Sequence, residues 1–451
     1  MVDFFMIALF LVILFCILGV ITGIATGLLP GLHVNNIALI LLSLSGAFVS
    51  AFSFLLEMGL PSDFIFLLIG VYIIACSLAH TVLDCIPSFF LGAPDPDTAL
   101  SVLPAHALLM EGKGFEAVSL SAMGSYGAVL FCFLLVIPIR FVIGSPVFFY
   151  ETLREIMLFV LIAVSILMIG TEKSKISFLE LKRYWPSIFG MAFALFVFLL
   201  SGFFGFVIFE IVVESPIGLE SPVLFPALAG LFGMPTLVTS LMTSPVIPEQ
   251  NLGDVVLDKK TKKSSIMSIV TGSLGGILVS IIPGITSATG TVISMNIRGE
   301  SSKRQTIITL SAVNTACAFF VVIMMFVILR SRSGAALAVM DLIAVEEWSH
   351  ILIPQYLCYL LIAVLLAGTF AYFLTLFIGK IFARKFANIP YSLVVKLTIS
   401  MVVILVFLFT GFMGLLVLLI ATFIGLLPVE FGVRRSHCMG ILLIPIIFYF
   451  L

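Results

Sequence analysis

The chain has 451 residues, of which 62% are hydrophobic and 10% are charged, and its mean hydropathy is +1.31. A soluble domain is about half apolar and about one quarter charged, so this composition excludes a soluble protein. The formal net charge of −1 gives no sign of a nucleic-acid partner. At roughly 20 to 25 apolar residues per crossing, we expect an all-α polytopic membrane protein with about 10–12 transmembrane segments in the cell membrane.

The N-terminal part of the chain is unusual in its charge. No lysine or arginine precedes Lys113, whereas acids such as Asp3 and Asp63 are present. The first apolar run therefore lacks the basic flank of a secretory signal peptide, and we interpret it as a retained membrane element. None of the seven cysteines forms a Cys-x-x-Cys pair. We therefore interpret them as small buried apolar residues and not as a disulfide or zinc framework. Apolar segments follow along the chain at about 4–29, 33–55, 64–83, 117–143, 153–171, 186–213, 223–243, 266–296, 305–329, 350–380, 391–411 and 413–427.

One motif occurs twice with identical spacing. The first copy is Gly19-x3-Gly23-x6-Pro30-Gly31, and the second is Gly272-x3-Gly276-x6-Pro283-Gly284. Small-x3-small patterns alone are common in packed membrane helices, but the shared Pro-Gly ending indicates two structural repeats. We therefore divide a single membrane domain into a first repeat with connecting helices, residues 1–245, and a second repeat with the C-terminal helices, residues 246–451.

The charges around the second copy predict its shape. Basic residues lie on both sides of it, four lysines at 259–263 before it and Arg298, Lys303 and Arg304 after it. Because short basic loops face the cytoplasm, both ends lie inside, which predicts a re-entrant hairpin that turns at Pro283-Gly284. The first copy has only acids at its ends, so its hairpin enters from outside. We therefore expect two inverted-topology repeats, with the N-terminus outside.

The two hairpin tips are candidate substrate-binding positions. Backbone groups freed by Pro-Gly at membrane depth are tolerated only where they are buried in protein or line a cavity. Small polar side chains follow each tip on the first turn of a half-helix, whose N–H groups favour an anion. The alternative is that these side chains are ordinary N-caps. We assign substrate binding here to Pro30, Gly31, Asn35 and Asn36 in the first copy and to Pro283, Gly284, Thr286 and Ser287 in the second.

Each half contains a second interrupted region. Residues 92–100 read Gly-Ala-Pro-Asp-Pro-Asp-Thr-Ala-Leu, in which Asp97 and Thr98 are further candidates for the substrate path. A solvated loop with Asp97 capping the next helix is the open alternative. In the second half, residues 330–337 contain Arg330 and Arg332. These arginines either clamp a carboxylate or phosphate or snorkel to the membrane interface.

Polar residues inside apolar segments are candidates for ion coupling, because placing them in lipid is costly. His80 and Asp84 lie one helical turn apart and could carry a proton, whereas the side-chain oxygens of Asn314 and Thr315 suit Na⁺. The alternative for each residue is a hydrogen bond between helices. We expect no resident cofactor and no metal site, with Na⁺ or H⁺ as the coupling ion.

Enzymatic motifs are weak in this chain. Glu346-Glu347-x-x-His350 lacks the second histidine of a His-Glu-x-x-His motif, and the sequence has no Walker-type phosphate loop. We therefore expect that the chain is not an enzyme. The alternative, an intramembrane enzyme, requires that His80 with Asp84, or Glu347 with His350, converge with other polar groups.

Several further motifs occur in a fixed order. They are the Gly-rich helix ending in Pro30-Gly31, the 94–100 region followed by Gly112-Lys113-Gly114 and Glu116-Ala117-Val118, the second Pro283-Gly284, and Ser311-Ala312-Val313-Asn314-Thr315-Ala316. Over about residues 15 to 340 this order resembles the large permease subunit of the tripartite tricarboxylate transporters. The chain departs from that pattern where Asn314-Thr315 replaces an Asn-Asn pair, where Ala-Pro-Asp-Pro-Asp-Thr replaces Gly-Thr-Pro, and where Leu103-Pro104-Ala105-His106 replaces Asp-Gly-Tyr-Pro.

The resemblance implies a site lined by the matching motif residues Pro30, Gly31, Pro283, Gly284 and Asn314. It also implies a small membrane subunit, an extracytoplasmic binding protein, and transport driven by Na⁺ or H⁺. We therefore predict a secondary transporter of a small anionic solute, a carboxylate by resemblance, that works by alternating access. The alternative within transport is a carrier of lipid-linked phosphate, in which Arg140, Arg330 and Arg332 contact the head group. The sequence predicts no oligomeric state.

Overall fold

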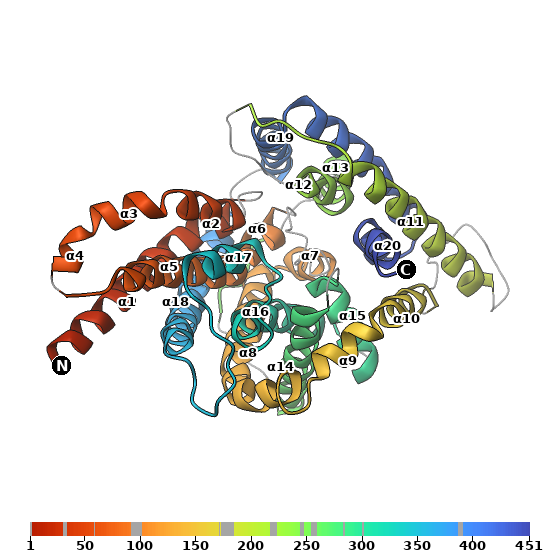
Figure 1. The fold of residues 1–451 in the computed structure, drawn as a ribbon. Helices are drawn as coiled ribbons and strands as arrows, with labels where there is room; N and C mark the ends of the chain where they lie inside the picture. Colours follow the sequence, from red (N-terminus) through yellow and green to blue (C-terminus); the bar gives the residue numbers. More distant parts are fainter. Residues whose placement is uncertain are drawn as a thin grey trace.

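The computed structural model describes residues 2–29, 34–57, 59–91, 102–170, 172, 185–216, 223–243, 248–253, 259–282, 285–299, 302–386 and 391–451, and every regular element in these ranges is a helix (Figure 1). Eight helices of the described chain are long and apolar enough to cross a membrane, or nine spans if a pair bent by 73° at 149–170 is one span. Two shorter apolar stretches, at 224–239 and 435–449, bring the number close to the prediction. An all-α, multi-pass membrane fold is confirmed.

The described helices are, in chain order, α1 (Val2–Leu28), α2 (Val34–Ser43), α3 (Ser45–Ala51), α4 (Ser53–Glu57), α5 (Ser62–Leu83), α6 (Cys85–Phe90), α7 (Val102–Met110), α8 (Gly114–Ile143), α9 (Phe149–Glu155), α10 (Met157–Gly170), α11 (Trp185–Phe209), α12 (Leu224–Leu228), η2 (Ala229–Gly233), α13 (Met234–Thr243), α14 (Lys259–Ile281), α15 (Ser287–Arg298), α16 (Lys303–Val327), α17 (Gly334–Leu342), α18 (Gln355–Phe386), α19 (Tyr391–Glu430), η3 (Arg435–Met439) and α20 (Gly440–Tyr449). Helix α19 is interrupted at Gly411, whose φ of 62° lies in the left-handed region that glycine adopts readily.

The helices form two groups (Figure 1). Helices α1 to α9 and α14 to α18 pack in one group, whereas α10 to α13, α19 and α20 lie to one side of it. The groups touch where the Thr286 hydroxyl at the start of α15 donates to Met439 Sδ in η3, at 3.6 Å. Both groups contain helices from both halves of the chain, so the boundary at residue 245 stays a prediction.

In the first half, α1 and α5 pack with their backbones in contact. A Cβ atom on Gly23 of α1 would stand only 2.6 Å from the carbonyl oxygen of Cys76 and 2.7 Å from Ala79 Cβ, both on α5. Real side chains do not fit at such distances, so glycine is what allows this close approach. We call this contact, with Gly19 one turn earlier, the first glycine seam.

In the second half, α14 and α16 pack in the same way. A Cβ atom on Gly276 of α14 would stand 2.5 Å from the carbonyl oxygen of Val313 and 2.6 Å from Ala316 Cβ, both on α16. Gly272 meets Thr309 one turn earlier. This contact is the second glycine seam. The repeated sequence motif therefore forms a repeated packing contact, which the motif alone only suggested.

Helix direction explains the shape of the second copy. Because Gly272 meets Thr309 and Gly276 meets Val313, α14 and α16 run in the same direction. The chain must therefore return between them, and α15, with 12 residues, is the return leg. This geometry agrees with the predicted hairpin, although both Pro-Gly tips lie outside the described residues.

The two seams run in opposite directions. Helix α18 runs parallel to α5 and antiparallel to α8, and α8 runs parallel to α16. The residue pairs that fix these directions are Phe64 with Tyr359, Leu78 with Gly368, Val129 with Gly368, Val118 with Gly379, Gly124 with Ile308, and Gly144 with Val327. Opposite directions are what inverted repeats require, and the inverted relation of the complete repeats stays a prediction.

Basic residues gather at one end of the first group. Helices α8, α14 and α16 begin at this end, and α18 finishes there because it runs against α8. Their described basic residues include Lys113, Lys259, Lys262, Lys263, Lys303, Arg304, Lys380, Arg384 and Lys385. Glu111 joins two of the helix starts through ion pairs of 3.0 Å to Lys113 and to Lys303. Helices α1 and α5 begin at the opposite end, near Asp63. This arrangement agrees with the predicted orientation, in which the N-terminus lies outside, and that orientation stays a prediction.

Candidate functional site

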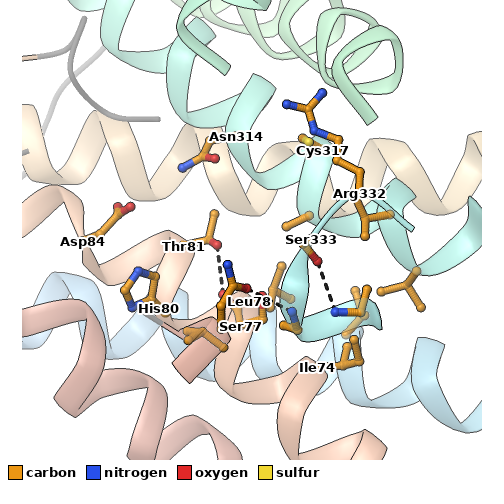
Figure 2. A pocket seen from close by; sticks show the side chains of 18 residues that line it. Ile74, Ser77, Leu78, His80, Thr81, Asp84, Asn314, Cys317, Arg332 and Ser333 are labelled. Atoms are coloured by element: carbon orange, nitrogen blue, oxygen red, sulfur yellow. Dashed lines mark hydrogen bonds between the residues drawn. The ribbon is translucent and has the colours of Figure 1, made fainter. Parts of the chain in front are cut away.

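A cavity of about 250 Å³ lies where helices from both halves of the chain meet (Figure 2). Its walls come from α2 and α5 in the first half and from α16, the start of α17, and α18 in the second half. This size is near the lower end for ligand sites, which favours a small solute. The polar residues that line it are Asn35, Ser77, His80, Thr81, Asp84, Asn314, Cys317, Arg332 and Ser333.

The α5 wall carries the predicted pair His80 and Asp84. Both side chains line the cavity, and both are nearly buried, with 6% and 5% of their surface exposed. The His80 Nδ1 atom lies 3.1 Å from the Thr26 hydroxyl on α1, so the first glycine seam also holds the imidazole ring. Asp84 follows the last turn of α5 and starts α6. The pair combines a titratable base with an acid on one helix face, as a proton carrier requires.

The α16 wall carries Asn314. Its side-chain oxygen accepts a hydrogen bond of 3.1 Å from the hydroxyl of Ser287, the first residue of α15. One predicted substrate residue and one predicted ion residue are therefore bonded to each other. The next residue, Thr315, is fully buried and does not line the cavity, because successive side chains on a helix point about 100° apart. Its predicted role in ion coupling stays a prediction.

Asn35 connects the two halves of the chain. Its side-chain oxygen accepts a hydrogen bond of 2.9 Å from the backbone N–H of Ala335, in the first turn of α17. Ser333, the N-cap of α17, accepts from Ala336 N–H at 3.2 Å. The first turn of α17 thus begins at the cavity, and a residue that follows the first Pro-Gly pair helps to cap it.

Arg332 binds backbone carbonyls, which the sequence did not suggest, and both of its predicted roles, carboxylate clamp and interfacial anchor, stay predictions. Its Nη1 atom donates to the carbonyl oxygen of Ile282 at 2.8 Å and also to that of Val279, and its Nη2 atom donates to that of Ile285. The guanidinium therefore holds backbone carbonyls beside the second Pro-Gly pair. In Figure 2 it lies on the opposite side of the cavity from Asp84.

The remaining predicted residues divide into two sets. Thr286 is an N-cap of α15, and its hydroxyl accepts from Thr289 N–H at 3.4 Å, so the capping alternative holds for it. The other set lies outside the described residues or, for Asn36, has a side chain that is not described: Pro30, Gly31, Asn36, Asp97, Thr98, Pro283 and Gly284.

Of the two pairs on which the intramembrane-enzyme alternative rests, His80 and Asp84 do meet other polar side chains in the cavity, whereas Glu347 and His350 do not line it. Arg140 is 4% exposed, and its guanidinium donates to the carbonyl oxygens of Ser145, Trp348 and Ser349, so it is not a lipid head-group contact. Glu347 and His350 are exposed. Within the described ranges, no three His, Cys, Asp or Glu side chains come together to hold a metal ion.

Ser77 and Thr81 are lining residues that the sequence interpretation missed. They lie at helical spacing from His80 and Asp84 and form one polar stripe along the otherwise apolar α5. This periodicity was the signal that could have found them. The role of Arg332 had no such signal, because its partners lie about 50 residues away in the sequence.

Known proteins resemble the chain over nearly its whole length. A profile described as the tripartite tricarboxylate transporter TctA family matches residues 13–440. An uncharacterized protein of Methanocaldococcus jannaschii is 29% identical over 445 residues, which cover 97% of this chain and 99% of that protein. No solved structure matches the chain. The resemblance found in the motifs is confirmed, and the chain belongs to the TctA family of tripartite tricarboxylate transporters.

Proposed function

We propose that this membrane component of a tricarboxylate transport system carries a small carboxylate anion by alternating access, with the 250 Å³ cavity as its substrate site. The observation that supports the proposal is convergence. Asn35, which follows the first Pro-Gly pair, and Asn314, which is bonded to Ser287 after the second, meet in one cavity between the halves. Sites at the junction of repeats are typical of secondary transporters.

The charges divide the cavity into two sides. Arg332 and the start of α17 lie on one side, where a positive charge and a helix N-terminus favour a carboxylate. His80 and Asp84 lie on the other, where an acid and an imidazole suit a proton or Na⁺. We propose that the anion binds on the first side and the coupling ion on the second, with Asn314 between them.

Family membership implies partner subunits, for which we propose a small membrane protein and an extracytoplasmic binding protein. The lipid-linked phosphate carrier has less support, because Arg140, one of its three predicted head-group contacts, is buried outside the cavity and binds backbone carbonyls. An intramembrane enzyme has less support at Glu347 and His350, which are exposed, and family membership favours transport over catalysis at His80 and Asp84.

The proposal can be tested on the purified full chain. We expect tricarboxylates such as citrate, but not inorganic phosphate, to raise its melting temperature and to be taken up by proteoliposomes under a Na⁺ or pH gradient. Asn314→Ala removes a polar group from the cavity, so affinity should fall about tenfold, the effect of losing one hydrogen bond to a charged group. Thr369→Ala on α18, outside the cavity, is the control and should bind as the unmodified protein does. No carboxylate binding in any condition, or unchanged affinity in Asn314→Ala, would overturn the proposal.

A further inference from the structure

Arg332 has an unusual set of partners for an arginine beside a cavity. It lies between the end of α16 and the start of α17, and its guanidinium donates to carbonyl oxygens of the last turn of α14 and of the residues on both sides of the second Pro-Gly pair. No carboxylate pairs with it among the described residues. Three backbone carbonyls are therefore its partners in place of an acid.

These carbonyls need a cation for a physical reason. The carbonyls of Val279 and Ile282 lie at the end of α14, where the last carbonyls of a helix have no partner within the helix and their dipoles add to a partial negative charge; that of Ile285 lies just before α15. Lipid supplies no hydrogen bonds to such groups. In transporters with broken helices, such carbonyl groups coordinate the coupling cation. The guanidinium of Arg332 brings a permanent positive charge and several donors in one plane, so it meets the same need from within the chain.

We infer that Arg332 is a tethered substitute for a coupling cation at the second helix break, so that this break takes up no free Na⁺. One consequence rests on the proposed transport function: any coupling ion binds on the side of His80 and Asp84. The position of the charge is fixed at two points. Its guanidinium is bound to α14, and Ala335, three residues later, is bound to Asn35 of α2.

The test uses the full chain in detergent with two substitutions of different charge. Arg332→Gln keeps donors but removes the charge, and Arg332→Lys keeps the charge on a smaller group. We expect Arg332→Gln to lower the melting temperature by roughly 5 °C or more and Arg332→Lys to lower it less. Equal losses would show that the charge is not required and would overturn the inference.

Cation rescue separates a cation substitute from ordinary packing. Arg332→Ala vacates the place of the guanidinium, so millimolar guanidinium or Na⁺, compared with choline at equal ionic strength, should restore most of the lost melting temperature. The matched control is Arg330→Ala, two residues earlier, whose exposed guanidinium lies 3.5 Å from the Tyr150 hydroxyl. It should show no such response. A loss in Arg332→Ala that neither cation restores would also overturn the inference.

These measurements do not depend on transport. If cation rescue is observed but no carboxylate is bound by any form of the protein, the proposed function fails and the role of Arg332 stands. If carboxylate binding is observed but rescue is not, the proposed function stands and the role of Arg332 fails. In proteoliposomes, Arg332→Ala should gain a dependence on external Na⁺ or guanidinium that Arg330→Ala lacks.

Discussion

Single side chains around the cavity do two jobs, because they line it and they hold backbone groups that broken helices leave open. Asn35 accepts from a backbone N–H of α17, and Arg332 donates to three carbonyls beside α14. Arg140, outside the cavity, likewise donates to the carbonyls of residues 145, 348 and 349, near the end opposite the basic helix starts. In a protein where lipid supplies no hydrogen bonds, such side chains are what make irregular backbone possible.

Asn35 gives the first prediction. Asn35→Ala leaves the N–H of Ala335 without this acceptor, so we expect a loss of about 1 kcal/mol, as for other helix caps. Asn35→Asp keeps an acceptor oxygen and should lose less. Melting temperatures in detergent measure the effect, with Ser50→Ala on the exposed side of α3 as control. Equal melting temperatures for Asn35→Ala and Asn35→Asp would contradict the assigned hydrogen bond.

At the scale of helices, the two glycine seams determine how the first group is assembled. In each seam a helix that precedes a Pro-Gly pair lies against the next long helix with no side chain between the backbones. Close approach of this kind maximises van der Waals contact, which is a main source of stability between helices in lipid. The seams are therefore where a larger side chain should have its greatest effect.

The second prediction compares two glycines. Gly276→Leu places a side chain against the Val313 carbonyl oxygen, so the helices must separate, and we expect a loss of about 3 kcal/mol or more. Gly46→Leu on α3 is the matched control, because no atom lies within 4 Å of the position of its Cβ. Thermal unfolding of both variants gives the comparison. Similar stabilities would show that the seam is not closely packed in the protein.

The third prediction concerns the contact between η3 and the residue that follows α10. Glu172, outside the membrane-spanning helices, lies with one carboxylate oxygen 2.6 Å from Arg434 Nε and 2.8 Å from His437 Nε2. Burial raises the pKa of Glu172, but hydrogen bonds to His437 and Arg434 outweigh it, and the pKa lies below its ordinary value of 4.5. The stabilisation is therefore fully present above pH 4.5 and is lost as the pH falls through the lowered pKa.

Glu172→Gln tests this contact. Above pH 5 the variant should be less stable than the unmodified protein by about 1 to 2 kcal/mol, since it removes the charge that pairs with the partly exposed Arg434 and weakens the hydrogen bond to the buried His437. The difference should shrink as the pH falls below 4.5, because the unmodified carboxyl group then also becomes neutral. Unfolding measured between pH 3 and pH 7 gives the difference. A difference that is constant over this range would contradict the assignment.

Sequence reasoning succeeded where a feature depends on neighbouring residues. The membrane class follows from composition, and the place of His80 and Asp84 at one cavity follows from their helical spacing. The hairpin that the charges on both sides of Pro283-Gly284 predict agrees with the helix directions, but its tip lies outside the described residues. Sequence reasoning could not predict contacts between distant residues. The sequence treated Thr315 and Asn314 alike, but only Asn314 lines the cavity, and nothing in the sequence pointed to the backbone carbonyls that Arg332 binds. Glu172 and His437, 265 residues apart, carried no sequence signal.

At the scale of the whole molecule, the charges are divided between two ends. The starts of α8, α14 and α16 and the end of α18 share one basic end, and α1 and α5 begin at the other. The basic end faces the cytoplasm in most membrane proteins. The orientation predicted from loop charges therefore means that the basic end faces the cytoplasm and the end where α1 and α5 begin faces outside.

The fourth prediction tests that statement. Single cysteines are introduced as Asp63→Cys and Lys262→Cys, both exposed, in a chain whose seven native cysteines have been replaced. In intact cells a membrane-impermeant maleimide should label Asp63→Cys and not Lys262→Cys, and inverted membrane vesicles should give the opposite result. Labelling of Lys262→Cys in intact cells would place the N-terminus in the cytoplasm.

The glycine seams have a mechanical consequence. Backbone atoms that interlock at Gly23 and at Gly276 prevent α1 from sliding along α5 and α14 from sliding along α16, so each pair should move as a stiff strut. The cavity lies between these struts, with α5 on one side and α16 on the other. Alternating access, as proposed, then becomes a rotation of one strut against the other. We expect the free-energy cost of that rotation to fall on the contacts between the struts, those of α5 with α16 and of α17 with both, and hardly at all on the packing inside each strut.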